Sequence, residues 1–163
     1  CSSDLVTGVE HNEEGKPSEA PMNRQNQMEK RMRKTESLVI NNPVLLNEHE
    51  DEADILYIGF ISTKGAIGEG AERLERHGVK VNTMHIRQLH PFPKDIVQQA
   101  INKASKVIVA EHNYQGQLSS ILKMNTQVND KLVNQTKYDG KPFLPYEIEE
   151  KGLEIAKELK ELV

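Results

Sequence analysis

The sequence is poor in cysteine, in aromatic residues and in long apolar runs. Its single cysteine is Cys1, so this chain alone offers no internal disulfide, no cysteine-ligated zinc site and no iron–sulfur cluster. No stretch approaches the roughly 18 apolar residues that a membrane span needs, and no signal-peptide pattern is present. We therefore expect a cytoplasmic protein without a membrane partner.

Positive and negative charges are nearly balanced, so the chain has no large excess of either sign. The chain carries 21 Lys and Arg against 25 Asp and Glu, a formal net charge of −4 at pH 7. A general nucleic-acid binder would be basic, so no nucleic-acid partner is expected. Only 36% of the residues are hydrophobic, which suggests that part of the chain lies on a surface rather than in a core. The first residue is Cys rather than Met, which suggests a piece of a longer polypeptide.

Motifs for metal binding and for nucleophilic catalysis are missing. The six histidines form no His-x-x-x-His pair and no set of Glu and His typical of catalytic zinc, so no metal site is expected. No Gly-x-Ser-x-Gly elbow marks a catalytic serine. Cys1 at a chain end is a poor candidate for a nucleophile.

Composition divides the chain near residue 50. Residues 1–50 form a polar arm in which glycine and proline interrupt scattered apolar residues. One helix is predicted within it, at about Pro21–Leu38, with Ser18 as the N-cap and a thin apolar stripe. Because this helix can bury little apolar surface, we expect it to lean on another surface. It carries a basic cluster made of Lys30, Arg31, Arg33 and Lys34.

From residue 51 to 163, apolar runs typical of buried strands alternate with amphipathic helices. Short connections between them favour right-handed crossovers, so the pattern predicts a three-layer α/β domain with a mostly parallel sheet. The strands are predicted at 54–60, 79–86, 106–110 and 132–136. The helices are predicted from Ser62 or Thr63 to Gly78, and at 94–104, 118–128 and 146–162.

The loop after the first predicted strand is Ser62-Thr63-Lys64-Gly65. Free backbone N–H groups and the helix dipole converge at such a turn, so Ser62, Thr63 and Gly65 are candidates for binding an anion. The loop is neither a Walker A sequence nor a dinucleotide-binding glycine fingerprint. A capped helix start, with small residues where helix and strand pack closely, explains the same residues without a ligand, and both interpretations remain open.

A first polar cluster lies in a glycine-bounded loop at residues 7–18. Its candidate residues are Glu10, His11 and Glu13, which place carboxylates around one imidazole. They are suited to hydrogen-bonding a partner or to ordering the wall of an active site. A solvated turn is the simpler alternative.

A second polar cluster follows the third predicted strand, with Glu111, Asn113 and Gln117 as candidate residues. Ligands and partners of open α/β sheets meet the domain at the carboxyl ends of the strands. The alternative is structural, because Glu111 and Asn113 could cap the next helix while Gly116 permits its entry. From the residues alone, the structural interpretation has at least as much support as the functional one.

Five motifs follow one another along the chain and together resemble a known family. They are Thr7-Gly8-x-Glu10-His11-x-Glu13-x-Gly15, Met28-Glu29-Lys30-Arg31-Met32-Arg33-Lys34, Ser62-Thr63-Lys64-Gly65, Pro91-Phe92-Pro93 and Glu111-x-Asn113-Tyr114-x-Gly116-Gln117-Leu118. In this order they resemble the C-terminal region of the alpha subunit of 2-oxoacid:ferredoxin (acceptor) oxidoreductases, especially the 2-oxoglutarate type. The resemblance spans nearly the whole chain. The chain departs from it at Ile61, where relatives often have glycine.

The resemblance implies a fold and a reaction. Residues 51–163 would form the transketolase C-terminal-like domain shared by thiamine enzymes. The whole enzyme would decarboxylate a 2-oxoacid oxidatively, form an acyl-CoA and pass electrons to ferredoxin, using thiamine diphosphate, magnesium and an iron–sulfur cluster. Implied partners are the beta subunit, a preceding pyrimidine-binding domain and a second alpha subunit, with ferredoxin and coenzyme A serving the whole complex.

The sequence also indicates which part of that enzyme is present. The Gly-Asp-Gly signature that binds the thiamine diphosphate is absent, and so are the cysteines of a cluster. This chain is therefore expected to bind no cofactor, to contain no catalytic residue and to act at a subunit interface. Two alternatives remain: a free-standing α/β domain that binds a phosphorylated small molecule, and a dimerisation domain of another thiamine enzyme.

Overall fold

The computed structural model describes residues 8–49 and 52–161, except for the side chain of Asn129. The chain forms two compact units, Cys1–Asn41 and Asn42–Val163. Thr7, at the start of the first predicted loop, lies outside the described residues, and so does the predicted helix end at Leu162.

The first unit contains a loop and the helix α1, Pro21–Glu36. Proline is well tolerated at the first helical position, and Pro21 takes that place. The prediction of Ser18 as N-cap is wrong: Ala20 is the cap residue and no side chain caps the helix. Ser18 lies too far before Pro21, and its backbone N–H instead donates to the Glu10 carbonyl oxygen, 2.7 Å away. Gln27 is the one buried residue of α1.

The second unit is built around a five-stranded sheet in the order β1-β3-β2-β4-β5. Neighbouring strands are parallel except for β1, which pairs antiparallel with β3. The strands are β1 Val44–Asn47, β2 Ala53–Phe60, β3 Val81–Ile86, β4 Ala104–Glu111 and β5 Leu132–Thr136. The sequence did not predict β1, which falls within the range assigned to the polar arm. Its four residues have only one buried side chain, which leaves no clear apolar period.

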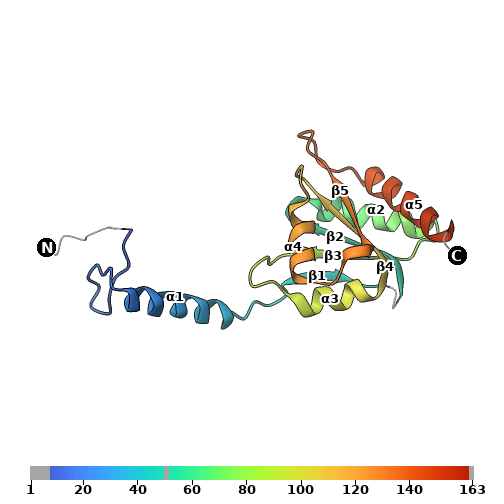
Figure 1. Cartoon of the computed structure of the whole chain (residues 1–163). Coiled ribbons are helices and arrows are strands. Elements are labelled where there is room, and N and C mark those ends of the chain that lie inside the picture. Colours follow the sequence, from blue (N-terminus) through green and yellow to red (C-terminus); the bar gives the residue numbers. More distant parts are fainter. Residues whose placement is uncertain (1–7, 50–51, 162–163) are drawn as a thin grey trace. The chain divides into compact units, whose positions relative to one another are not determined.

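Two pairs of helices cover the two faces of the sheet (Figure 1). The helices are α2 Lys64–Arg76, α3 Lys94–Asn102, α4 Gln117–Asn125 and α5 Pro145–Glu161. Side chains alternate along β2, so that Ile55 and Tyr57 pack with α2 and α5, whereas Leu56 and Ile58 pack with α3 and α4. The predicted three-layer α/β fold with a mostly parallel sheet is confirmed.

Two glycines let α2 and α5 approach each other closely. A Cβ at Gly70 would lie 2.6 Å from Cβ of Ile148, and a Cβ at Gly152 would lie 2.4 Å from Cδ1 of Leu74. Tyr57 of β2 stabilises the position of α5, because its hydroxyl donates to the Ile148 carbonyl oxygen at 2.7 Å. Burial raises the pKa of the Tyr57 hydroxyl above its usual range, so this group stays a hydrogen-bond donor.

Candidate functional site

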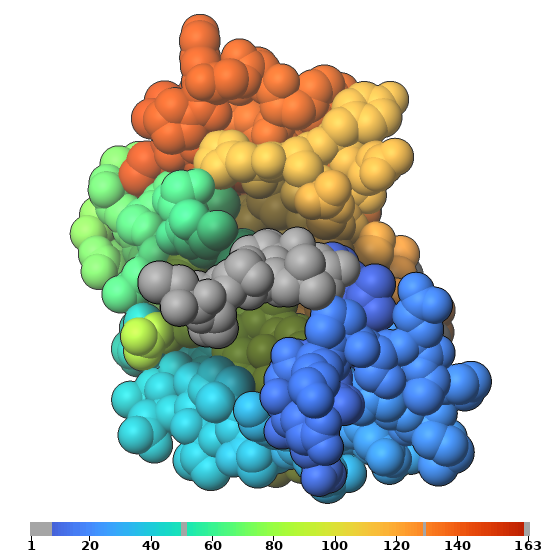
Figure 2. Space-filling view, turned by 90° about the vertical axis from the view of Figure 1, so that its left-hand side faces the viewer, coloured from blue at the N-terminus to red at the C-terminus, as the bar shows by residue number. Residues whose placement is uncertain are grey.

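The carboxyl ends of β2, β4 and β5 meet at one edge of the sheet, because these strands are parallel neighbours. Figure 2 looks onto this edge, where the green segment after β2, the yellow segment after β4 and the orange segment after β5 lie next to one another. A cavity of about 280 Å³, here called the edge pocket, lies between the first two segments. Its lining includes Ser62, Glu111, Asn113 and Gln117, so it joins two motifs that are about 50 residues apart in the sequence.

Glu111 ends β4 with its side chain turned into the first turn of α4. Its carboxylate accepts hydrogen bonds from the Leu118 N–H at 2.7 Å, the Ser119 N–H at 3.2 Å, the Ser119 hydroxyl at 2.9 Å and the Asn113 amide at 2.6 Å. Only 5% of Glu111 is exposed. The first N–H groups of a helix lack partners within it, and they carry partial positive charge. The carboxylate therefore fills the place at this helix start that a bound anion would take.

Asn113 and Gly116 complete this arrangement. The Asn113 side-chain oxygen accepts from the Gly116 N–H at 2.7 Å and from the Gln117 N–H at 3.2 Å. Gly116 has a φ of +73°, a left-handed conformation that side chains disfavour, and a Cβ there would lie 3.0 Å from Nδ2 of Asn134. Glu111 and Asn113 thus order the loop and cap α4, which is the structural alternative that the sequence left open. Gln117 remains exposed beside them.

The candidate residues of the anion loop after β2 differ in exposure. Thr63 is 1% exposed, and its hydroxyl accepts from the Phe60 N–H at 3.1 Å and donates to the Phe60 carbonyl oxygen at 3.3 Å. Gly59 makes room for it, since a Cβ at that position would lie 2.4 Å from the Thr63 hydroxyl oxygen. The side chain of Thr63 therefore closes the strand end and does not face a ligand. Ser62 and Gly65 are exposed.

Ile61 lies at the mouth of the edge pocket in an unusual backbone conformation. Its φ is +55°, in the left-handed region that a β-branched residue rarely adopts. The side chain is 71% exposed, so packing within the chain does not compensate for this conformation. Such strain is typical of contact and functional sites.

A second cavity of about 510 Å³ adjoins the edge pocket and shares Ser62 and His112 with it. Tyr138 lines it, and the Tyr138 ring meets that of Tyr114 edge-on, with centroids 4.9 Å apart. The two tyrosines are 65% and 73% exposed. Exposed tyrosines are typical of the centres of protein interfaces. The sequence pointed to Tyr114 only as part of a motif and missed Tyr138, because their contact depends on the pairing of β4 with β5.

In the first unit, Glu10 holds the loop against α1. Its carboxylate is hydrogen-bonded by both Arg31 terminal nitrogens, at 2.7 and 2.6 Å, and by Arg24. The hydrogen bonds and charge of Arg31, joined by those of Arg24, outweigh partial desolvation and lower the pKa of Glu10 to about 2. Glu10 therefore orders this unit and is not free to bind a partner.

The other two candidates of this loop differ from Glu10. The carbonyl oxygen of His11 accepts from the Asn23 amide at 3.0 Å and from the Gln27 amide at 3.1 Å, which fixes the backbone. The imidazole of His11 and the carboxylate of Glu13 are exposed. They are two of the polar side chains that this loop presents outward, together with Glu14 and Lys16, on a backbone that α1 holds in place.

The described residues do not assemble the ligand groups that the magnesium ion and the iron–sulfur cluster of thiamine enzymes need. Within residues 8–49 and 52–161 there is no group of three or more His, Cys, Asp and Glu side chains that could hold a metal ion. The only cysteine of the chain is Cys1. The anion position at the start of α4 is filled by Glu111.

Across the same described ranges, no helix is long and apolar enough to cross a membrane.

The second unit is thus a three-layer α/β domain whose sheet edge carries the hydrogen-bonded carboxylate of Glu111 and two exposed tyrosines, Tyr114 and Tyr138. Residues 53–146 match the family described as pyruvate:ferredoxin oxidoreductase core domain II, and the chain belongs to this family. The chain is 32% identical over 148 residues to subunit alpha of 2-oxoacid:ferredoxin oxidoreductase 2 from Aeropyrum pernix. The aligned part makes up 88% of this chain and 23% of that relative. A 2-oxoacid:ferredoxin oxidoreductase subunit alpha from Saccharolobus solfataricus is 34% identical over 147 residues.

Solved structures agree with this assignment. The 2-oxoglutarate:ferredoxin oxidoreductase from Magnetococcus marinus, solved with 2-oxoglutarate, coenzyme A and succinyl-CoA, superposes with a TM-score of 0.79 at 32% identity over 93% of this chain and 26% of that one. A split-gene transketolase, at 11% identity and a TM-score of 0.56, shares the fold. The chain thus spans about a quarter of the length of the relatives it matches.

Proposed function

We propose that this chain is an interface lobe of the alpha subunit of a 2-oxoacid:ferredoxin oxidoreductase. The whole enzyme converts a 2-oxoacid, with 2-oxoglutarate as the first candidate, and coenzyme A to an acyl-CoA and CO2, and passes the electrons to ferredoxin. The similarity to alpha subunits over 88% of the chain supports the assignment. The resemblance to the Magnetococcus marinus enzyme, whose structure holds 2-oxoglutarate and succinyl-CoA, favours this substrate.

The lobe contributes a shaped surface, and other parts of the enzyme hold the thiamine diphosphate, magnesium and iron–sulfur cluster. The single observation that carries this role is the hydrogen-bonding of Glu111, whose carboxylate is already satisfied by four donors of its own chain. A carboxylate has about four acceptor positions, so one that accepts four hydrogen bonds from its own chain has little capacity left for a ligand. The large hydrophobic side chains that this edge exposes include Ile61, Tyr114 and Tyr138.

The partners that this surface fits are the beta subunit, the pyrimidine-binding domain that precedes this region in the family and, at a further face, a second alpha subunit. Tyrosine rings bury large areas at a low cost in side-chain entropy, so Tyr114 and Tyr138 are suited to anchor such a contact. His11 and Glu13 form the corresponding polar contact of the first unit. With its backbone fixed on α1, this loop can serve as part of an active-site wall.

The proposal is tested with the whole enzyme that contains this chain, assembled with its beta subunit. We expect CoA-dependent reduction of ferredoxin with 2-oxoglutarate to exceed that with pyruvate and with 2-oxoisovalerate. A preference for another 2-oxoacid would refute the substrate assignment while leaving the role of the lobe intact.

The role of the lobe is tested separately by calorimetric titration of the 163-residue chain with thiamine diphosphate and magnesium. No heat of binding is expected, because the sequence has no Gly-Asp-Gly signature and residues 8–49 and 52–161 contain no group of three or more metal ligands. Micromolar binding would contradict the proposal. Titration with inorganic phosphate tests the alternative of a phosphate-binding domain, for which Ser62 and Gly65 would supply the site.

A further inference from the structure

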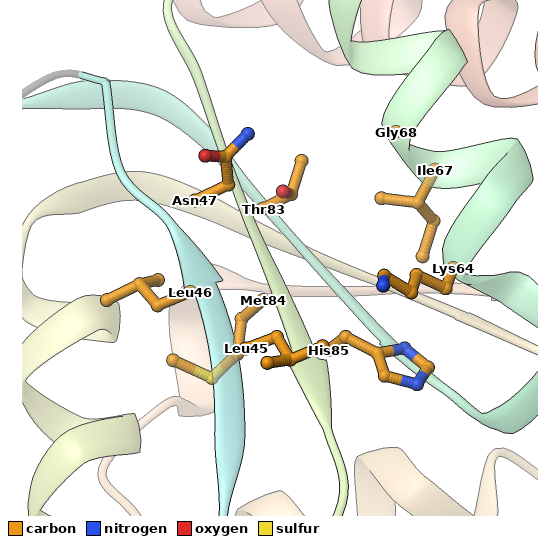
Figure 3. Close-up of a pocket in the computed structure, with 9 residues that line it drawn as sticks. All are labelled: Leu45, Leu46, Asn47, Lys64, Ile67, Gly68, Thr83, Met84 and His85. Carbon is orange, nitrogen blue, oxygen red and sulfur yellow. The ribbon is translucent and has the colours of Figure 1, made fainter. Parts of the chain in front are cut away.

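A third pocket lies on the sheet face beside α2, and it shares no lining residue with the two cavities of the edge. It has a volume of about 280 Å³ and is bounded by β1, β3 and the first turns of α2 (Figure 3). Of the family motifs only Ser62-Thr63-Lys64-Gly65 contributes to its lining, through Lys64, and the proposed interface does not use it. Its lining combines apolar walls with several polar side chains, which is typical of small-molecule sites.

The strand register explains why these side chains gather. Leu45 of β1 lies directly opposite His85 of β3, and Asn47 lies opposite Thr83. Side chains of directly paired residues project from the same face of a sheet, and residues two apart along a strand share that face. Both pairs therefore face the same side, and Figure 3 shows Lys64 of α2 reaching toward them.

The polar side chains of this pocket have no partners within the part of the chain that the structure describes. Nδ1 of His85 is buried and makes no hydrogen bond. Lys64, Thr83 and Asn47 likewise show no side-chain hydrogen bond or ion pair among residues 8–49 and 52–161. Buried polar atoms are nearly always hydrogen-bonded in folded proteins, so Nδ1 of His85 is a polar atom that the described residues leave unsatisfied, on a side chain that lines the pocket.

The charges of the pocket indicate the kind of ligand. Lys64 contributes a positive charge, and no carboxylate lines the pocket. Burial, together with the positive charges of Lys64 and Arg87, lowers the pKa of His85. His85 is therefore neutral at pH 7, with one ring nitrogen that donates a hydrogen bond and one that accepts. A cation next to a neutral donor suits a singly charged carboxylate better than a phosphate dianion.

We propose that this pocket binds a small aliphatic monocarboxylate. The carboxylate lies between the ammonium of Lys64 and the imidazole of His85, within reach of the Thr83 hydroxyl, and the hydrocarbon tail lies along Leu45 and Ile67. Since a water takes about 30 Å³ in the liquid, the volume of about 280 Å³ admits a ligand of about eight or nine heavy atoms. A six-carbon acid such as hexanoate has this size.

The test uses hexanoate and the 163-residue chain, followed by two-dimensional NMR of the backbone amides. We expect saturable shift changes at Thr83, His85 and Ile67. Hexan-1-ol, which keeps the tail and lacks the charge, should bind about tenfold more weakly or worse. Equal binding of the alcohol, or no saturable change with hexanoate, would overturn the proposal.

Two variants locate the site. Lys64→Met removes the charge of an exposed residue and should weaken hexanoate binding by about tenfold, whereas Lys123→Met, an exposed residue of α4, should leave it unchanged. Gly68→Leu should abolish binding, because the space beyond its Cα is open and a leucine would fill the pocket. If Gly68→Leu disturbs the fold, Lys64→Met still decides the question. Unchanged affinity in Lys64→Met would refute the assignment.

A last comparison separates a ligand site from a docking site. The whole alpha subunit, assembled with its beta subunit, should bind hexanoate with an affinity within about threefold of that of the 163-residue chain, if the pocket stays open. Binding that is lost in the assembled enzyme would overturn the proposal, because another segment of the enzyme would then cover the pocket. The substrate preference of the enzyme does not enter this comparison.

Discussion

Replacing Glu111 tests whether the edge of the sheet is held together by its own carboxylate. In Glu111→Ala the N–H groups of Leu118 and Ser119 lose their acceptor, and both residues are buried, at 5% and 1% exposure. Each unsatisfied buried donor costs about 1–3 kcal/mol, and the favourable interaction of the charge with the helix start is lost as well. The expected loss of unfolding free energy is about 3–5 kcal/mol, similar to that for breaking a buried ion pair.

Urea unfolding of the 163-residue chain measures this loss. With an m-value of about 2 kcal/mol/M, the midpoint should fall by about 2 M in Glu111→Ala. Glu111→Gln keeps the shape of the side chain but turns an amide N–H toward other donors. Its urea midpoint should therefore lie between those of Glu111→Ala and the parent chain. Glu158→Ala, an exposed carboxylate of α5, is the control and should stay within about 0.5 kcal/mol. A loss below about 1 kcal/mol in Glu111→Ala would refute the reasoning.

Three further predictions concern backbone and charge. On α2, Gly68→Ala should stabilise the folded chain by about 1 kcal/mol. Gly70→Ala should destabilise it by about 1–3 kcal/mol, because the new Cβ would lie 2.6 Å from Cβ of Ile148. Thermal unfolding compares the two variants, and equal melting temperatures would contradict the packing of α2 on α5. Ile61→Gly should raise the melting temperature by about 2–4 °C through relief of about 1 kcal/mol of strain, and a lower one would mean that Ile61 packs within the chain. In the folded chain the pKa of Glu10 is about 2, below its usual value of 4.5, so the stabilisation from its contacts is complete above pH 4.5 and is lost as the pH falls toward 2. The side-chain amide NMR signals of Asn23 and Gln27 should report this loss. Signals that stay unchanged down to pH 2 would contradict the prediction.

Much of the second unit could be predicted from the sequence because its strands are buried on both faces. Ala53–Phe60 and the run 107–110 within β4 are almost continuously apolar, and this pattern separates them from the amphipathic helices between them. The strand β1 gave no such signal, since it is short, lies at the sheet edge and leaves Leu45 and Leu46 partly exposed. Its place depends on pairing with β3, which is distant in the sequence.

The candidate site was predictable only in part. For the motif around Glu111 and Asn113 the sequence left open a helix cap and a contact with a ligand or partner, and the structure shows that both side chains cap α4. The sequence could not show that the Thr63 hydroxyl turns back to Phe60, because this depends on the space left by Gly59. The contacts made by Tyr138 and His85 are set by strand pairing, and no local pattern marks either residue.

The account depends most on the exposed edge being a contact surface, with the chemistry performed elsewhere in the enzyme. The most direct test is the association of the alpha and beta subunits in the double variant Tyr114→Ala/Tyr138→Ala, measured by sedimentation over a range of concentrations. The account predicts association weakened by about tenfold or more, with kcat unchanged once the beta subunit is saturating. Unchanged association together with a reduced kcat would contradict it, because the tyrosines would then serve the reaction itself.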